Sequence, residues 1–300
     1  MEELERAQTR LDHIGTVAPI LSAVRTISLG SWKAALRQST SIRRYEERLN
    51  AILPSLVPHL AAGRRAWPAT RHESHEDVST PKRVAVLVVG SERGMCGRFN
   101  AVAAERAERY LIELETGGAQ VELMALGSRA SRILRRSQRP LVWSGPLSMT
   151  TLPPFRTAFD LTRRWLERYE AHDLDAADIV YNGYHSLGRY DPTVVRVIPP
   201  QLSQNGAASQ GERWPPLIVE TDPLSLYVRI VEQQVALNLY GSLLDAAAAE
   251  HSTRYQLMEA ATQSADRLIT ELTLVIQTAR QAEITQDMQE LAAGAGMLGD

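Results

Sequence analysis

The sequence predicts an α/β fold: a long antiparallel coiled coil of N- and C-terminal helices flanks a small doubly wound α/β domain. Between Leu224 and Ala293 there is no proline and only one glycine, Gly241, which favours one very long helix. In the middle of the chain, short apolar runs alternate with helically spaced stretches, as in a parallel sheet covered by helices. Apolar and small residues near the N-terminus recur at intervals of three and four, which predicts a partner for the long helix.

Composition limits the classes of function. The chain has 300 residues, is 44% hydrophobic and carries a formal net charge of −2, so nothing draws it as a whole to nucleic acid. Cys96 is the only cysteine, which excludes an internal disulfide and a multi-cysteine zinc site. The charged N-terminus lacks a secretory-type apolar core, and no run approaches the roughly 18 apolar residues of a membrane span. We therefore expect no nucleic-acid partner and no direct membrane insertion.

The N-terminal zone is predicted to be one long helix over residues 1–62. A stretch of proline, glycine, serine and charge at 63–81 then reads as a linker. The positions expected to face the partner helix are small or apolar and follow a spacing of three and four. They are Val24, Ile27, Ser31, Ala34, Gln38, Ser41, Tyr45, Leu49, Ile52 and Leu56.

The middle zone, residues 82–200, is predicted to be a Rossmann-like α/β domain. Its strands are expected at 84–89, 121–126, 141–143, 179–181 and 194–198, the last two forming a hairpin. Its helices are expected at 101–115, 128–136 and 155–169. A second breaker-rich stretch at 201–221 is expected to be a loop.

The C-terminal zone, residues 222–300, is predicted to be the second long helix. Asp222 and Pro223 supply an acidic N-cap and a proline in the first turn. Apolar residues at intervals of three and four mark the expected packing seam. They are Val228, Val231, Val235, Leu239, Leu243, Leu257, Ala261, Leu268, Leu272, Val275 and Ala279.

A glycine-rich loop, VVGSERGMCGRFN, follows the first expected strand, where many proteins hold a phosphate. It matches neither the P-loop pattern, which needs Lys-Ser or Lys-Thr, nor G-x-G-x-x-G. We therefore interpret it as a structural turn. A nucleotide-binding enzyme with a helical arm remains the alternative from another class. The residues assigned to the structural loop are Gly90, Arg93, Gly94, Cys96, Gly97 and Asn100.

Other candidate chemistry is weak. Cys96 could be a thiolate at a helix N-terminus, and His72 with His75 could be a metal pair, although a polar linker explains the histidines better. Three aspartates at 173, 175 and 178 look like a surface turn before a strand. No spaced catalytic set is present, so we predict no catalytic, cofactor-binding or metal-binding residues and no cofactor.

The C-terminal helix carries the most specific sequence motifs. Met258 to Thr262 read M-E-A-A-T, and Ala279 to Asp287 read A-R-Q-A-E-I-T-Q-D. These closely resemble the C-terminal helix of the gamma subunit of F-type ATP synthases, with M-x-A-A-T and A-R-Q-x-x-I-T in the same order. The loop SERGMCGRFN is similar to the family's S-D-R-G-L-C-G-x-[LF]-N.

The resemblance implies a non-catalytic central-stalk subunit that transmits rotation between an ion-translocating membrane ring and a catalytic alpha-beta head. Its implied partners are the alpha and beta subunits, epsilon and the c-subunit ring, at the cytoplasmic face of the cell membrane. The implied contacts with a loop of beta are Arg280, Gln281 and Thr285. An apolar shaft tip is expected at Met288, Leu291, Met297 and Leu298.

The first helix departs from the family pattern. The segment from Gly15 to Val24 lacks the family's lysines and contains Pro19, which is expected to break a helix or to start one. A divergent sodium-translocating or hydrolysis-directed F-type ATPase is therefore kept as an alternative.

Overall fold

The computed structural model describes residues 2–56, 81–137, 139–148, 151–200 and 220–296. The predicted linker at 63–81 and loop at 201–221 lie almost entirely outside them, as do His72 and His75. The chain divides into two compact units, one of residues 28–254 and one of residues 1–27 with 255–300. The predicted domain boundaries stay predictions.

The unit of residues 28–254 contains a five-stranded sheet in the order β3-β2-β1-β4-β5. β1 (Arg83–Val89) pairs in parallel with β2 (Gln120–Leu126) and with β4 (Ala176–Ser186). β3 (Leu141–Gly145) continues the parallel sheet beyond β2, and β5 (Arg189–Ile198) forms an antiparallel hairpin with β4. The predicted mostly parallel sheet that ends in a hairpin is confirmed.

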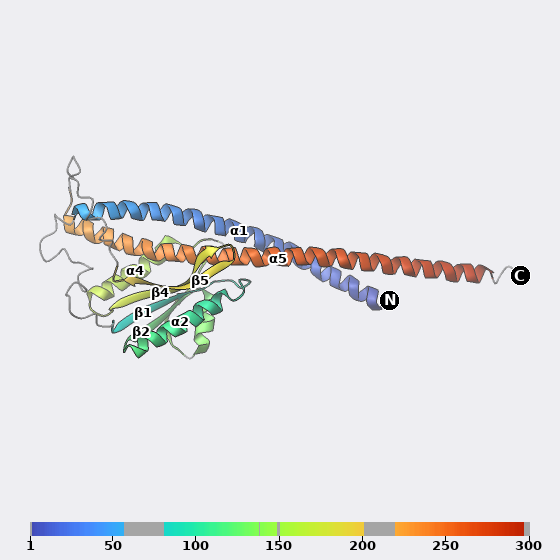
Figure 1. Cartoon of the computed structure of the whole chain (residues 1–300), viewed down its shortest axis with the longest axis horizontal. Coiled ribbons are helices and arrows are strands. Elements are labelled where there is room, and N and C mark those ends of the chain that lie inside the picture. Colours follow the sequence, from blue (N-terminus) through green and yellow to red (C-terminus); the bar gives the residue numbers. More distant parts are fainter. Residues whose placement is uncertain (1, 57–80, 138, 149–150, 201–219, 297–300) are drawn as a thin grey trace. The chain divides into compact units, whose positions relative to one another are not determined.

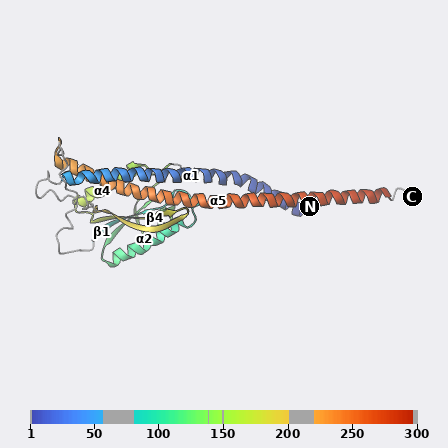
Figure 2. The same ribbon diagram turned by 45° about the horizontal axis from the view of Figure 1, so that its top comes forward.

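Helices cover both faces of this sheet (Figure 1, Figure 2). α2 (Phe99–Thr116) and α3 (Ser128–Leu134) pack on the side chains of Val84, Val86 and Val88. α4 (Phe155–Glu170) packs on the other face, which is lined by Ala85 and Leu87, together with parts of α1 and α5. Because β1 is buried on both faces, every residue from Val84 to Val89 is apolar and buried.

The two long helices are α1 (Glu2–Leu56) and α5 (Pro223–Gly296). Asp222 caps α5 as predicted, since its carboxylate accepts hydrogen bonds from the backbone N–H of Ser225 at 2.9 Å and from the Ser225 hydroxyl at 2.7 Å. Within the unit of residues 28–254, Asn50 of α1 is hydrogen-bonded to Gln234 of α5. Further along, Ala35 packs with Ala247 and Ala248, so the two helices run antiparallel there.

The predicted seam on α1 is correct at Leu49 and Leu56, which are buried. Nearer the N-terminus it is displaced by one residue, from Ile27 to Ser28 and from Ala34 to Ala35. The buried positions of this helix in the sheet-containing unit include Ser28, Ala35, Leu49 and Leu56, which are spaced by multiples of seven as in a coiled coil. The expected positions Ile27, Tyr45 and Ile52 are between 40% and 46% exposed. A spacing of threes and fours fits two neighbouring stripes of one helix, and only tertiary packing selects between them.

The unit of residues 1–27 and 255–300 consists of the two helix ends. Arg25 forms an ion pair with Glu259 at 3.1 Å. Its buried apolar side chains are Ala7, Met258, Ala265 and Ile276. In this unit the predicted seam positions Leu257 and Val275 are instead 39% and 47% exposed, one residue away from the buried Met258 and Ile276. In the unit of residues 28–254 the α5 seam is correct, since the predicted positions Val231, Val235, Leu239 and Leu243 are buried.

α1 continues through Pro19 without interruption, so the expected break is wrong. Proline removes one backbone hydrogen bond and crowds the carbonyl of the residue four positions earlier. That residue is Gly15, which has open space where a Cβ would lie. Pro19 and Gly15 are both exposed, so water can hydrate the carbonyl that loses its partner.

One expectation about hydropathy is also corrected. Within Leu4–Leu53, α1 contains an 18-residue window whose mean hydropathy reaches 1.2, enough by composition to cross a membrane. Only 6% of that window is buried within the described residues. A single such helix is weak evidence for a span, because the helices of soluble proteins pass the same test.

Candidate functional site

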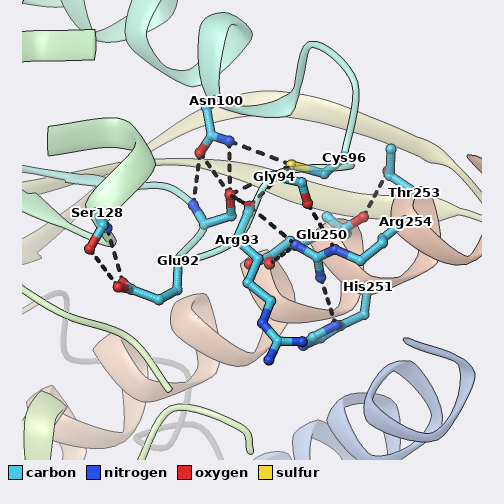
Figure 3. Close-up of polar contacts among 12 residues, drawn as sticks. Glu92, Arg93, Gly94, Cys96, Asn100, Ser128, Glu250, His251, Thr253 and Arg254 are labelled. Atoms are coloured by element: carbon cyan, nitrogen blue, oxygen red, sulfur yellow. Dashed lines mark hydrogen bonds and ion pairs between the residues drawn. The ribbon is translucent and has the colours of Figure 1, made fainter. Parts of the chain in front are cut away.

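The glycine loop between β1 and α2 is held by its own side chains (Figure 3). Asn100, in the first turn of α2, accepts a hydrogen bond at its Oδ1 from the backbone N–H of Ser91 at 2.8 Å. The Asn100 amide donates in turn to the Ser91 hydroxyl at 2.8 Å, and that hydroxyl donates to the Arg93 carbonyl at 2.6 Å. The backbone N–H of Ser91, a donor that a bound phosphate could use, is thus already engaged within the chain.

Gly90 is required by space. A Cβ at this position would lie 2.4 Å from the Cβ of Ala130 and 2.6 Å from Oδ1 of Asn100. Gly97 has a φ of 57°, in the left-handed region that glycine adopts most easily. Both glycines therefore serve the tight turn from strand to helix, as the structural interpretation of the loop proposed.

Glu92 occupies the N-terminus of α3. Its carboxylate accepts hydrogen bonds from the backbone N–H of Ser128 at 3.0 Å and of Leu147 at 3.0 Å, and also from the Ser128 hydroxyl. Burial acts to raise the pKa of Glu92, but these hydrogen bonds outweigh it and hold the pKa below its usual value. An internal carboxylate thus fills the place after β2 where a nucleotide-binding protein would present these N–H groups to its ligand.

Cys96 is buried, with 1% of its surface exposed. Burial raises the pKa of its thiol above the ordinary value, and the neighbouring Ser91 hydroxyl lies 3.5 Å from the sulfur. A nucleophilic cysteine needs access and a lowered pKa. The interpretation of Cys96 as a catalytic thiolate is therefore wrong.

Arg254 of α5 joins the loop to the long helix. Its guanidinium donates to the carbonyl of Gly94 at 3.2 Å, to the carbonyl of Arg93 at 3.4 Å and to the carboxylate of Glu250 at 2.5 Å (Figure 3). We call Arg93, Gly94, Glu250 and Arg254 the arginine clamp. Arg254 is only 4% exposed and Glu250 is 9% exposed, so this is a buried network whose charges compensate each other.

Burial shifts the pKa values of two titratable side chains in and beside this network. Desolvation raises the pKa of Glu250 in spite of the attraction of Arg254. Desolvation, reinforced by the positive charge of Arg254, lowers the pKa of His251 to about 4, and its Nδ1 lies 3.2 Å from the Arg254 guanidinium. His251 is therefore neutral at pH 7.

Glu250, His251 and Arg254 were not among the site residues predicted from the sequence. Their signal was visible in outline: a glutamate and an arginine four residues apart follow four consecutive alanines, Ala246 to Ala249, inside a helix with few charges. Nothing in the one-dimensional pattern placed the glycine loop beside them, because the two segments are about 160 residues apart in the chain.

The aspartates expected in a surface turn have different positions. Asp178 is fully buried in β4, where it binds Arg196 at 2.8 Å and 3.0 Å and accepts a hydrogen bond from Tyr110 at 2.7 Å. Asp173 and Asp175 form ion pairs with Arg83 near the start of β1. Among the described residues, no group of three or more His, Cys, Asp or Glu side chains is placed to hold a metal ion.

The candidate contact residues near the C-terminus are accessible. Arg280, Gln281 and Thr285 are all exposed on α5, and the Thr285 hydroxyl donates to the Gln281 carbonyl at 2.7 Å within the helix. At the expected tip, Met288 is 68% exposed and Leu291 is 74% exposed. Met297 and Leu298 lie outside the described residues.

A family model described as ATP synthase matches residues 3–298, nearly the whole chain. The chain belongs to the ATP synthase gamma chain family. It is a central-stalk gamma subunit and a non-catalytic part of ATP synthase. This assignment takes the place of the alternative of a stand-alone nucleotide-binding enzyme.

Relatives of similar length support the assignment. The ATP synthase gamma chain of Trichlorobacter lovleyi is 25% identical, over 98% of this chain and 98% of its own. That of Granulibacter bethesdensis is 27% identical, over 99% and 100%. That of Arthrobacter sp. is 29% identical, over 89% and 97%.

Solved structures share the gamma-type fold. A chain of the Euglena gracilis mitochondrial ATP synthase aligns with a TM-score of 0.60 at 16% identity, over 99% of this chain and 95% of that one. A chain of the Tetrahymena thermophila mitochondrial enzyme, in a structure of its central stalk and c-ring, aligns with a TM-score of 0.56 at 18% identity, over 81% and 99%. These likenesses concern the fold alone.

Proposed function

We propose that this subunit carries rotation between an ion-translocating ring of c subunits and a catalytic head of alpha and beta subunits. The observation that carries the proposal is the exposed end of α5. Every residue from Gln281 to Ala293 is exposed while the segment stays helical. Such a segment has little reason to be helical alone, because most helical stability in proteins comes from packing. We infer that the head surrounds it.

Arg280, Gln281 and Thr285 are the proposed contacts with a loop of beta. The Arg280 guanidinium has the geometry for a paired contact with a carboxylate. Gln281 and Thr285 are four residues apart and so share a face of the helix. Met288 and Leu291, one turn further along, offer apolar surface with few directional bonds, which suits a contact that is remade in each orientation.

Deletion of the residues after Glu271 tests this function. In assembled ATP synthase in vesicles, the truncated subunit is expected to lose most coupled turnover because the segment inside the head is gone. The control is a full-length chain in which Gln256 and Gln263, exposed on α5 before the deleted segment, are replaced by alanine. Normal coupling in the truncated complex would refute the proposal.

The contact residues are tested separately by a double substitution, Arg280→Ala with Gln281→Ala. We expect a lower rate of ATP hydrolysis at an unchanged amount of assembled complex, because the rotor would lose contacts with beta without losing its fold. The same Gln256 and Gln263 variant serves as the matched control. Equal rates in both variants would remove Arg280 and Gln281 from the interface.

The remaining partners follow from this function. We propose that the epsilon subunit and the c-subunit ring contact the chain, and that the complex lies at the cytoplasmic face of the cell membrane. The family assignment and the long helical pair support these proposals. Cross-linking of the assembled complex followed by peptide identification would identify the chains in contact.

A further inference from the structure

The arginine clamp connects parts of the chain that belong to different layers of the fold. Gly94 and Arg93 lie in the loop after β1, and Arg254 lies on α5. The Arg93 and Gly94 carbonyls lie in a half-buried loop outside any helix or strand, so their hydrogen bonds must come from side chains or water. A planar guanidinium reaches two carbonyls and the Glu250 carboxylate at once. A single buried side chain therefore ties the loop to the helix.

Apolar packing reinforces this tie. Cys96 and Phe99, at the end of the loop, pack against Ala249 of α5. On other sides of the same helical turns, Ala246 packs in the main core, and Ala247 and Ala248 pack with Ala35 of α1. Four consecutive small side chains let the loop, the sheet and α1 all approach the α5 backbone closely. The helix is enclosed there by its own chain.

The loop is itself fixed to the sheet. Glu92 accepts hydrogen bonds from Ser128 at the start of α3 and from Leu147 after β3. On the other side, the side-chain amide of Asn182 in β4 donates to the Phe99 carbonyl at 2.7 Å. A force applied to the clamp therefore passes to the start of α3, to the segment after β3 and to β4 through paired groups, of which the Asn182–Phe99 bond is buried.

The clamp stands at a particular place on α5. Arg254 is the last residue of this helix in the unit of residues 28–254, and the residues from Tyr255 onward belong to the other unit. Under the proposed rotor function, torque along α5 enters the unit of residues 28–254 at this turn of the helix.

We propose that the arginine clamp is the point at which torque passes between α5 and the α/β unit, with Arg254 as the positioning residue. The inference rests on the proposed function as a rotor. It predicts that loosening the clamp lets α5 slip under load while ATP hydrolysis continues.

The test uses assembled ATP synthase in inverted vesicles, with Arg254→Met, Arg254→Lys and Glu250→Gln compared with wild type. Methionine keeps the packing of the side-chain stem but has no donors. Arg229→Met is the matched control, since Arg229 is exposed on the same helix. The first readout is the ratio of the steady membrane potential to the amount of ATP hydrolysed. A potential-sensitive dye measures this potential, whichever ion is coupled. The second is amide hydrogen exchange of residues 91–97 in the complex.

For Arg254→Met we expect a lower potential per ATP hydrolysed and at least about tenfold faster exchange in the loop, because the charged hydrogen bonds that close it are lost. Arg254→Lys should recover part of both values, and Arg229→Met should match wild type. A general loss of folding would lower hydrolysis and potential together and leave their ratio unchanged, which would overturn the proposal. If the Arg254→Met complex does not assemble, the ratio of potential to ATP hydrolysed in Arg254→Lys and Glu250→Gln tests the proposal instead.

The outcome of the clamp variants can be distinguished from the outcome of the truncation that tests the rotor function. If truncation after Glu271 abolishes coupling while the clamp variants keep the wild-type ratio, the rotor function stands and the clamp proposal fails. If truncation leaves coupling intact, the rotor function fails whatever the clamp variants do.

Discussion

In the glycine loop, the available space, more than chemistry, determines which residue type a position accepts. Gly90 is the clearest case, because the space for a Cβ is already taken by Ala130 and Asn100. Gly241, inside α5, has nothing within 4 Å of the corresponding position. The same residue type thus has opposite consequences at the two sites.

Substitution of these two glycines gives a matched prediction. Gly90→Ala is expected to lower the free energy of unfolding by about 1–3 kcal/mol, since overpacking forces the neighbours apart. Gly241→Ala is expected to raise it by about 0.5–1 kcal/mol, because alanine favours the helix. Urea denaturation of the purified chain measures both. A stable Gly90→Ala variant would mean that the loop adapts more easily than its packing indicates.

His251 gives the chain a defined response to acid. Its pKa is lowered to about 4 in the folded state by burial and by Arg254, against about 6.5 in an unfolded chain. Below pH 6.5 the unfolded state therefore binds a proton that the folded state does not. The contribution of His251 to stability is complete above this pH and is lost as the pH falls from about 6.5 to about 4.

The corresponding prediction compares His251→Gln with wild type at pH 7 and pH 5. The loss of unfolding free energy between these two values should be smaller in the variant, because glutamine does not titrate. The raised pKa of Glu250 acts in the opposite direction in both proteins, so the difference between them isolates the histidine. An identical pH dependence would contradict the burial of a neutral imidazole.

At the scale of whole elements, packing decides which side of each long helix is buried. In the unit of residues 1–27 and 255–300, Ile276 is 6% exposed and Val275 is 47% exposed. The two are adjacent β-branched residues with similar helix propensities, so their packing alone distinguishes them.

Ile276→Ala is expected to destabilise this helix pair by about 2 kcal/mol, since a buried side chain leaves a gap in the seam. Val275→Ala should change it by less than about 0.5 kcal/mol. Amide exchange of residues 272–280 reports the local stability of α5. Equal effects from the two substitutions would show that the seam is not at Ile276.

At the scale of the whole molecule, the proposed function implies that the exposed end of α5 becomes buried when the complex assembles. We predict that amides of residues 281–293 exchange rapidly in the free chain and slowly in the assembled complex, because an exposed helix of this length is marginal in water. Hydrogen exchange on both samples measures the change. Residues 246–254, which the chain itself encloses, are the internal control and should be protected in both.

The sequence by itself determined the classes and order of the elements. An unbroken run of helix formers from Leu224 to Ala293 allows little except a long helix, and apolar runs of strand length followed by helical spacing define a parallel sheet. The loop glycines and the A-R-Q-A-E-I-T segment then pointed to the family. All of these are local patterns, readable within a few turns of the chain.

Only the tertiary structure decided which side of each helix is buried and what the glycine loop touches. Neighbouring stripes on α1 both satisfy the spacing, and the choice of Ser28 and Ala35 over Ile27 and Ala34 depends on how close two backbones approach. The bond from Arg254 to Gly94 joins segments remote in sequence. Such contacts depend on the packing of the complete fold, so no local pattern encodes them.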